Sequence, residues 1–513
     1  MQKSYERGRR LARESVTSAL EYTLSDYQGD VKRVLYTSVT VGEGARFMNG
    51  DAVECSGVVD YNIVYIDTEG KLTPVSFSGD YELNLRCNGE VCNDVNTHTR
   101  VANYSVRLMG PRRFAVKALV ECDAVCLESS EYKVDGDGVD LPLEKKCAQV
   151  KIEKVGFGRG SEVELAEELI MLDGAVEDEV EVLLHRVEPR GAVYRRNDDG
   201  GAVKCTLAVR ALIAVKGEEP RNCEALIEML SKLEDTDIPE GENVLPSVSV
   251  LSSVITLSPS EEGVSVVASV IASGSVEIYE NTELEILDDC FSTDRDLELG
   301  KGDFAYTEHI FTKPICEKIS DIESRIEDGR KVRNLIYESA RVRTGEVRSV
   351  DDRVTIDGEM QISAISAEID DNGEICYAPL KLDLPIHLNV NSDCHIPANA
   401  RYNCHLDAES VHVEVNGSSL LVSANLVGYV SATCEKTCRA VTTIEATEEQ
   451  YPNDPSLISV YYPTLNESLF EIAKRFHISV TRLAQINELS ESVLASAVSP
   501  GSLVGVSHLM IKR

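Results

Sequence analysis

The chain has 513 residues, of which 43% are hydrophobic, and its formal net charge is −36. Its length exceeds one hydrophobic core and its apolar content excludes bulk disorder, so we expect about three to five packed domains. The acidity excludes a nucleic-acid binder of the usual kind, because such proteins neutralise phosphates with Lys and Arg. The sequence has no run of about 18 apolar residues, which excludes a membrane-spanning helix.

The first 29 residues form a segment in which charges recur, and no apolar signal-peptide core interrupts them. We interpret residues 1–29 as helical with a solvated charged face, and docking of the basic residues on a membrane or an acidic partner is the alternative. The fifteen cysteines have no framework spacing and no export signal precedes them, so we interpret them as reduced core residues. These features predict a cytoplasmic protein.

Strict alternation of apolar and polar residues recurs three times along the chain. Cys55, Cys205 and Ile356 mark equivalent positions, which are 150 and 151 residues apart. Alternation with a period of two predicts a strand with one buried face. The shared faces are Val53, Cys55, Gly57, Val59, Tyr61, Ile63 and Tyr65; Val203, Cys205, Leu207, Val209, Ala211 and Ile213; and Val354, Ile356, Gly358, Met360 and Ile362.

A hairpin recurs at a similar interval. Each copy has a Ser-Val pair, then turn residues, and then a second alternating strand, which together predict two antiparallel strands. The copies are Ser105-Val106, Gly110-Pro111 and Phe114-x-Val116-x-Ala118; Ser253-Val254, Pro259 to Gly263 and Val264-x-Val266-x-Ala268; and Ser410-Val411, Asn416-Gly417 and Leu420-x-Val422-x-Ala424. Two strands and a turn at matching offsets in three copies predict a threefold internal repeat.

The predicted fold class is mostly β, with three tandem β-sandwich-like repeats joined by partly helical linkers. The repeats span residues 30–135, 180–290 and 320–445, and the first two are separated by a linker at 136–179. Within the connecting regions, residues 161–180 and 320–340 have helix-like patterns. A small α+β domain, residues 455–508, follows the repeats. Residues 455–513 carry a net charge of +1, whereas the first 454 residues carry −37.

The C-terminal module is predicted to contain a strand, two helices and a strand. Ser468 and Glu471 form a capping box, and Ser479 can cap a second helix. The flanking strands are predicted at 458–461 and 503–506. The first helix has an apolar face made of Leu469, Ile472, Ala473 and Phe476, and the second contributes Leu483 and Ile486.

These residues, with Ile478-Ser479-Val480 and Pro500-Gly501, resemble a LysM domain. The resemblance implies a βααβ fold that binds N-acetylglucosamine polymers, usually peptidoglycan, in a groove between the loops 463–468 and 489–500. Where the family usually has Gly-Asp, this chain has Asn466-Glu467, and the missing glycine favours a protein ligand at the same face. The implied ligand- or partner-binding residues are Leu465, Asn466, Glu467, Ser468, Asn487, Leu489, Pro500 and Gly501.

The repeats are similar to the SPOCS family of endospore-forming Firmicutes. The similarity rests on residues 24–35, on residues 57–65 and on Asp288 to Thr293. It implies a non-enzymatic scaffold in spore coat assembly, located in the mother-cell cytoplasm at the forespore surface. In the SipL-like type of clostridia, the LysM domain binds the coat-basement morphogenetic ATPase. The alternative is a peptidoglycan-binding cell-wall protein.

Two patterns with possible chemistry are given structural interpretations. Residues 156–161 (GFGRGS) resemble part of a dinucleotide fingerprint, but Ser161 replaces its third glycine, so we predict a flexible turn with a Ser161–Glu164 capping box. Cys394-His395 and Cys404-His405 could suggest zinc, but adjacent strand residues face opposite ways, which favours core Cys and surface His. We therefore predict no enzyme activity, no catalytic residues, no metal and no cofactor.

Overall fold

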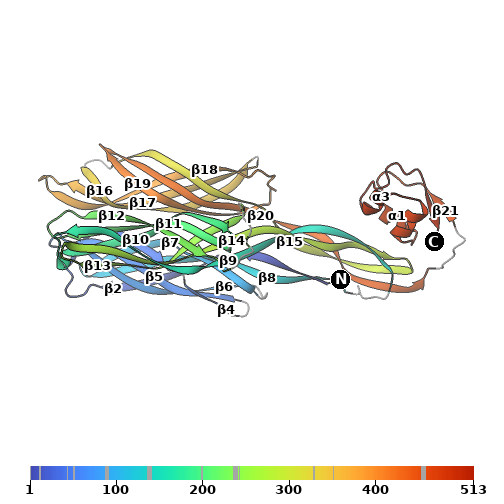
Figure 1. Ribbon diagram of the computed structural model, residues 1–513, viewed down its shortest axis with the longest axis horizontal. Coiled ribbons are helices and arrows are strands. Elements are labelled where there is room, and N and C mark those ends of the chain that lie inside the picture. Colours follow the sequence, from blue (N-terminus) through green and yellow to red (C-terminus); the bar gives the residue numbers. More distant parts are fainter. Residues whose placement is uncertain are drawn as a thin grey trace.

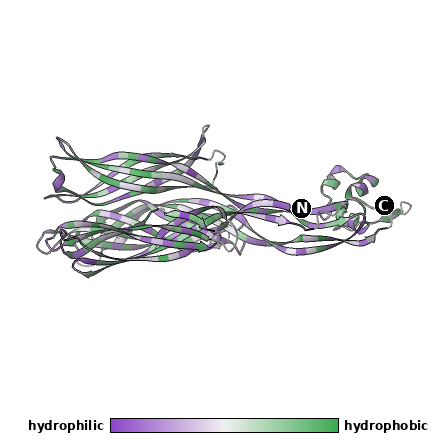
Figure 2. Cartoon of the chain, turned by 90° about the horizontal axis from the view of Figure 1, so that it is seen from below, coloured by the Kyte–Doolittle hydropathy of each residue, from purple (hydrophilic) through white to green (hydrophobic). Residues whose placement is uncertain are grey.

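The structure is a computed structural model of the chain. It describes residues 2–10, 13–42, 44–49, 52–86, 92–135, 141–197, 200–234, 238, 241, 243–326, 330–350, 352–451 and 458–512. The body is built from strands, and a small helical domain lies at one end of it (Figure 1). Hydrophilic and hydrophobic residues alternate along the strands of the body (Figure 2). The predicted fold class, mostly β with a small helical C-terminal domain, is confirmed.

Each of three units contains two sheets, which we call outer and inner. In the first unit, β8 is central in the outer sheet and β5 is central in the inner sheet. The outer sheet contains β1 (Gln2–Arg10), β2 (Glu14–Thr23), β7 (Cys92–Gly110) and β8 (Arg113–Lys133). The inner sheet contains β3 (Val31–Val41), β4 (Ala45–Asn49), β5 (Ala52–Asp67) and β6 (Leu72–Arg86).

The other two units repeat this arrangement with three strands in each sheet. The second unit has an outer sheet of β9 (Leu143–Asp173), β13 (Val244–Pro259) and β14 (Gly263–Ser292), and an inner sheet of β10 (Val180–Asn197), β11 (Gly200–Val215) and β12 (Arg221–Lys232). The third unit has an outer sheet of β15 (Arg295–Arg325), β19 (Arg401–Asn416) and β20 (Ser419–Gln450), and an inner sheet of β16 (Val332–Val350), β17 (Arg353–Ile369) and β18 (Ile375–Asn391). A 3₁₀ turn, Glu177–Glu179, precedes β10.

The recurring sequence patterns correspond to equivalent strands. The three alternating segments are β5, β11 and β17, the central strands of the inner sheets. The three hairpins are β7–β8, β13–β14 and β19–β20 in the outer sheets. The apolar faces of the two sheets in a unit pack on each other because each strand has its hydrophobic residues on one side. The predicted strands and hairpins are therefore confirmed.

The segments predicted as helical, 161–180 and 320–340, are mainly strand: the first is β9, a turn and the 3₁₀ turn before β10, and the second is the end of β15 and the start of β16, with residues 327–329 outside the described part of the chain. β-Bulges explain the error. In β9, Glu168 pairs with Val267 and Ile170 with Val266, which leaves Leu169 as an extra residue. A second bulge separates Ile319 from Ile322 in β15. An extra residue shifts the parity of a strand, so inward-facing residues become three or four apart, as they are in a helix.

The N-terminal segment is also extended rather than helical. β1 and β2 both pair with β8, with Gln2 opposite Lys133 and Glu14 opposite Cys122. In β2, alternate residues from Val16 to Tyr22 face the core of the first unit.

Residues 136–179, predicted as a linker, include β9, which is part of the second sandwich. Residues 156–161 lie within β9 instead of forming the predicted turn. The glycine at position 160 allows close approach of the neighbouring strand, because a Cβ on Gly160 would lie 2.6 Å from the carbonyl oxygen of Gly274.

The inner sheets meet in a common apolar cluster, which we call the central core. Equivalent residues of the three units contribute to it, because β3, β10 and β16 each have a bulge at the same place. It contains Leu35, Tyr36, Val64 and Leu72; Leu183, Leu184 and Leu212; and Ile336, Tyr337, Ile365 and Ala367. Both faces of each inner sheet are thus buried near this cluster, which joins the three units into one body.

The longest strands continue beyond the sandwiches as two-stranded ribbons, one from each unit. The ribbons β1–β8, β9–β14 and β15–β20 pack on one another around a shared apolar cluster, and we call this part the stalk (Figure 1). The Tyr132 hydroxyl of the first unit donates to the carbonyl oxygen of Val441 in the third, at 2.8 Å. β14 has 30 residues and β20 has 32, so each is long enough to run through a sandwich and the stalk.

The central core gives the first testable prediction. Leu212 is fully buried between the units, so Leu212→Ala removes apolar contacts and leaves a cavity. We expect it to lower the free energy of unfolding by about 2–5 kcal/mol, measured by chemical denaturation. Leu226, on the neighbouring strand β12, is 61% exposed, and Leu226→Ala is expected to change this free energy by less than about 0.5 kcal/mol. Equal effects of the two substitutions on the free energy of unfolding would contradict a stabilising role of the central core.

Candidate functional site

The C-terminal domain contains two short strands and three helices. The strands β21 (Ile458–Tyr461) and β22 (Leu509–Lys512) are antiparallel, with Val460 opposite Met510. The helices are α1 (Leu469–Arg475), α2 (Val480–Ile486) and α3 (Glu491–Ala495). The two predicted helices are confirmed, and α3 adds a short helix to the loop that was expected after α2.

Local sequence signals account for the helix starts. The Ser468 hydroxyl accepts from the Glu471 amide at 3.2 Å, and the Glu471 carboxylate accepts from the Ser468 amide at 2.9 Å, so the predicted capping box is present. Ser479 caps α2 through the Arg482 amide. These bonds satisfy amides at helix starts that have no partner within the helix. Leu469, Ile472 and Leu483 are fully buried in the core of this domain.

The second strand lies later than predicted. Residues 503–506 form turns, and the strand begins at Leu509. Gly501 and Gly505 have φ angles of 76° and 91°, and this left-handed backbone turns the chain inside the apolar run. Leu503 is buried as an anchor of the loop rather than as a strand residue.

The two loops that the resemblance implied for a ligand lie side by side. The Leu469 amide donates to the Ser502 hydroxyl at 3.2 Å, and the Phe470 amide donates to the Ala497 carbonyl at 3.0 Å. A Cβ on Gly501 would lie 3.6 Å from the carbonyl oxygen of Leu465. The structure therefore brings the loop 463–468 against the loop that contains Pro500, and we call this surface the loop face.

Two of the predicted site residues have their polar groups engaged within the domain. The Glu467 carboxylate accepts from the Thr464 amide at 2.9 Å, from the Tyr461 hydroxyl at 2.7 Å, and from Arg475 at 2.9 Å. The Thr464 amide is the main cause that holds the pKa of Glu467 below its ordinary value, and Tyr461 and Arg475 add to it. Glu467 thus fixes the shape of the loop.

Asn487 fastens the end of α2 to β22. Its side-chain amide donates to the carbonyl oxygens of Leu483 at 2.9 Å and Met510 at 2.8 Å, and its carbonyl oxygen accepts from the Met510 amide at 2.5 Å. The Leu489 amide donates to the Ala484 carbonyl at 3.0 Å, beside the same helix end. Of the predicted set, Leu465 and Asn466 are the loop residues that present exposed side chains, together with Pro500.

Exposed apolar side chains surround the loop face, and several were not predicted as site residues. Leu465 is 83% exposed, Val504 is 74% exposed, and Tyr462 is 72% exposed. Ile458, Val460 and Met510 extend this surface along the outer side of β21 and β22, with exposures of 59%, 54% and 44%. In the sequence, Ile458, Val460 and Tyr462 occupy alternate positions, which places them on the same side of an extended segment. This alternation is the signal that could have identified the β21 part of the surface. We call the six residues together the apolar surface.

The C-terminal domain is attached to the tip of the stalk through one side of α1, where Phe470 and Lys474 lie four residues apart. Lys474 donates to both carboxylate oxygens of Asp289, at 2.6 and 2.7 Å. Phe470 meets Phe291 edge to face with ring centroids 5.2 Å apart. Burial raises the pKa of Glu144, at the start of β9, whose carboxylate also accepts from the Val480 amide. These contacts involve the stalk strands β9 and β14 and leave the loop face uncovered.

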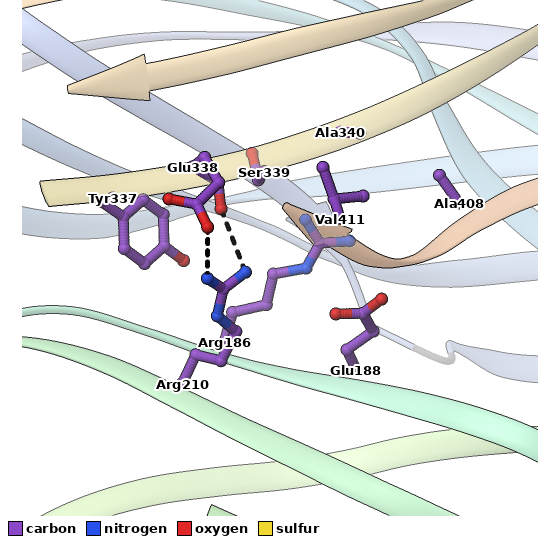
Figure 3. A pocket seen from close by; sticks show the side chains of 9 residues that line it. All are labelled: Arg186, Glu188, Arg210, Tyr337, Glu338, Ser339, Ala340, Ala408 and Val411. Carbon is purple, nitrogen blue, oxygen red and sulfur yellow. Dashed lines mark hydrogen bonds and ion pairs between the residues drawn. The ribbon is translucent and has the colours of Figure 1, made fainter. Parts of the chain in front are cut away.

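A polar cavity lies between the second and third units (Figure 3). It encloses about 260 Å³, including space open to solvent. Arg210 donates to Glu338 at 2.7 Å, and both side chains are nearly buried, so this ion pair joins the two units. The lining residues are Arg186, Glu188, Arg210, Tyr337, Glu338, Ser339, Ala340, Ala408 and Val411.

The two histidines of the Cys-His pairs that could suggest a zinc site lie on the surface. His395 pairs with Asp352 at 3.2 Å and His405 with Asp407 at 3.0 Å, and both histidines are exposed. Within the described part of the chain, no group of three or more His, Cys, Asp or Glu residues is placed to hold a metal. The thirteen cysteines described are free, and seven of them are buried. None of the described helices is long and apolar enough to cross a membrane.

The role of Asn487 can be tested by substitution. Asn487→Ala removes two hydrogen bonds to Met510 of β22 and one to Leu483 within α2, so we expect it to destabilise the C-terminal domain by about 1–3 kcal/mol. Hydrogen exchange of the β21 and β22 amides measures this change. Asn466→Ala, at an exposed position of the loop face, should leave their exchange unchanged. If both variants exchanged at the wild-type rate, Asn487 would have no fastening role.

Comparison with known proteins agrees with the geometry of this domain. The family model of the LysM domain matches residues 464–496, which run from the first loop through α1, α2 and α3. Neither curated proteins nor solved structures give a match to the chain. The chain therefore carries a LysM domain at its C-terminal end.

Proposed function

We propose that the protein is a non-enzymatic scaffold in spore coat assembly and that its LysM domain binds a protein partner. The observation that carries the proposal is the apolar surface around the loop face. Six large apolar side chains are between 44% and 83% exposed in this one small domain. A cluster of exposed apolar side chains is typical of a surface that another protein covers.

The polar groups of the domain support a protein partner over a sugar. Recognition of a sugar needs polar groups with free donors and acceptors, but those of Glu467 and Asn487 are engaged inside the domain. Leu465 and Val504 instead offer aliphatic contacts, which bind a hydrophobic protein surface by burial.

The arrangement of the chain supports a scaffold. The LysM domain is attached to the stalk tip by the Lys474–Asp289 ion pair and the Phe470–Phe291 contact, so it is held away from the three sandwiches. Linking a binding domain to a body with its own contacts raises the effective concentration at the second site. Through the SPOCS resemblance, we propose that the partner is the ATPase-type morphogenetic protein of the coat basement, at the forespore surface in the mother cell.

Peptidoglycan binding is the second candidate, and a separate observation favours it. The LysM family model matches this domain, and Tyr462 presents an exposed ring beside the loop face. An exposed aromatic ring offers an apolar platform with a polar tip, which suits the face of a sugar ring. Asn466, exposed beside it, could supply a polar contact.

The two candidates predict different effects of substitution in the full chain. Leu465→Glu places a charge in the apolar surface, so we expect at least a tenfold loss of affinity for the purified ATPase-type partner, measured by surface-immobilised titration. Leu226→Glu is the matched control, because Leu226 is 61% exposed on β12 in the body. It should leave the affinity unchanged.

Sedimentation with purified cell wall tests the second candidate. Co-pelleting of the wild-type chain that Tyr462→Ala abolishes would establish glycan binding at the loop face. Tyr27→Ala, at an 88% exposed tyrosine of the first unit, serves as the control.

The titration with the protein partner decides the first candidate. If Leu465→Glu retained full affinity for the protein partner, the apolar surface would not be its binding site and the proposal would fail.

A further inference from the structure

Two histidine–glutamate pairs join the three units where the sandwiches meet the stalk. In both pairs the second unit supplies the glutamate, and the first and third units each supply a histidine. Glu277 on β14 faces His98 of β7, and Glu153 on β9 faces His309 of β15. We call these four residues and Tyr279 the joint.

The first pair is a fully engaged carboxylate. Glu277 is 6% exposed, and it accepts from His98 at 2.8 Å, Asn96 at 2.6 Å and the Tyr279 hydroxyl at 2.6 Å. Burial works against the charge of Glu277, but the bonds from His98, Tyr279 and Asn96 outweigh it and lower its pKa to about 2. Burial also works against a charge on His98, but Glu277 outweighs it and raises the pKa of His98.

The second pair is buried and incompletely bonded. His309 Nδ1 lies 3.7 Å from Glu153 Oε1, and both side chains are 5% exposed. Within the described part of the chain, neither of these two atoms has a hydrogen-bond partner. His309 Nε2 lies 3.2 Å from the Thr312 hydroxyl. This buried pair packs the second and third units against each other at the joint.

Tyr279 connects the two pairs. Its hydroxyl donates to Glu277, and its ring stacks on the His309 ring at 5.7 Å with an interplanar angle of 20°. Around it, Val125 of the first unit, Val155 and Leu245 of the second, and Tyr429 of the third form an apolar cluster. The joint is therefore a polar chain across the three units that is buried at Glu277, Tyr279, Glu153 and His309 and reaches the surface at His98, whose side chain is 47% exposed.

We propose that the joint is a pH-sensitive clamp that holds the three units together when His98 is charged and loosens when His98 is neutral. A buried carboxylate attracts a charged histidine strongly because the local dielectric constant is low. A neutral His98 leaves Glu277 as a buried charge with no cation opposite it, which is costly. The proposal is independent of what the LysM domain binds.

The direction of the pH dependence follows from both members of the first pair. The raised pKa of His98 means that its contribution is complete below its ordinary value of 6.5 and is lost as the pH rises through the raised value. The lowered pKa of Glu277 means that its contribution is complete above its ordinary value of 4.5 and is lost as the pH falls toward about 2. The clamp is tightest between these two ordinary values and weakens in mildly alkaline solution.

The other groups that face these histidines act in the same direction or are neutral. Asp123 and Cys122, both on β8, face His98 and favour its charged form. His309 is packed against Glu153 of β9, the neutral ring of Tyr279 and the hydroxyl of Thr312.

Hydrogen exchange in the full chain tests the clamp. Amides of residues 276–281 and 305–313, corrected for the intrinsic effect of pH on exchange, are compared at about pH 6 and about pH 8.5. We expect exchange at the joint to rise on the order of tenfold at the higher pH, the change that corresponds to one pKa unit. In the variant His98→Gln, joint exchange should be fast and equal at both pH values.

A matched histidine pair provides the control. His387 lies 2.7 Å from Asp357 within the inner sheet of the third unit, so His387→Gln should leave the pH dependence of the joint unchanged. Glu277→Gln removes the partner of His98 and should also abolish the pH dependence, which keeps the test valid if His98→Gln fails to fold. Equal corrected exchange of the wild-type joint at both pH values would overturn the proposal, as would a wild-type response in Glu277→Gln.

Discussion

Burial of the second face of the inner sheets is the interaction on which the rest of the architecture depends. Each inner sheet has two faces, and in each unit one of them packs on the outer sheet of the same unit. Residues such as Val64, Leu212 and Ile365 place the other face in the central core. Because this core needs all three units, it fixes their positions, and it thereby brings the three ribbons together as one stalk.

The stalk in turn determines how the LysM domain is presented. Its strands are continuous with those of the sandwiches, so no separate hinge segment lies between the body and Asp289 or Phe291. These residues contact Lys474 and Phe470 along one side of α1, and the loop face lies next to the start of that helix. The joint lies at the base of the stalk, where a change in the packing of the ribbons also changes the direction of the tip.

Sequence reasoning succeeded where the signal is local and periodic. Alternation around Cys55, Cys205 and Ile356 predicted the central strands, and the capping box at Ser468 predicted α1. It failed where a bulge changes the parity of a strand, since the extra residue Leu169 gives β9 a helix-like spacing. It also could not show that Asn487 holds β22, because that contact joins residues whose proximity depends on the whole LysM fold. The central core was visible only as short continuous apolar runs, which alone do not identify a partner surface.

The covalent linkage of the three units has a consequence for stoichiometry. Three equivalent units on separate chains would carry three copies of the LysM domain, but here the described part of one polypeptide supplies all three units and carries one such domain on the stalk. The assembly is therefore monovalent at its tip, while its sandwiches are free to diverge: the cross-strand pair Arg186–Arg210 of the second unit is Ser38–Asn62 in the first and Ser339–Ser363 in the third. A molecule of this kind can cap or tether a single target, and any lattice it joins must grow through surfaces of the body.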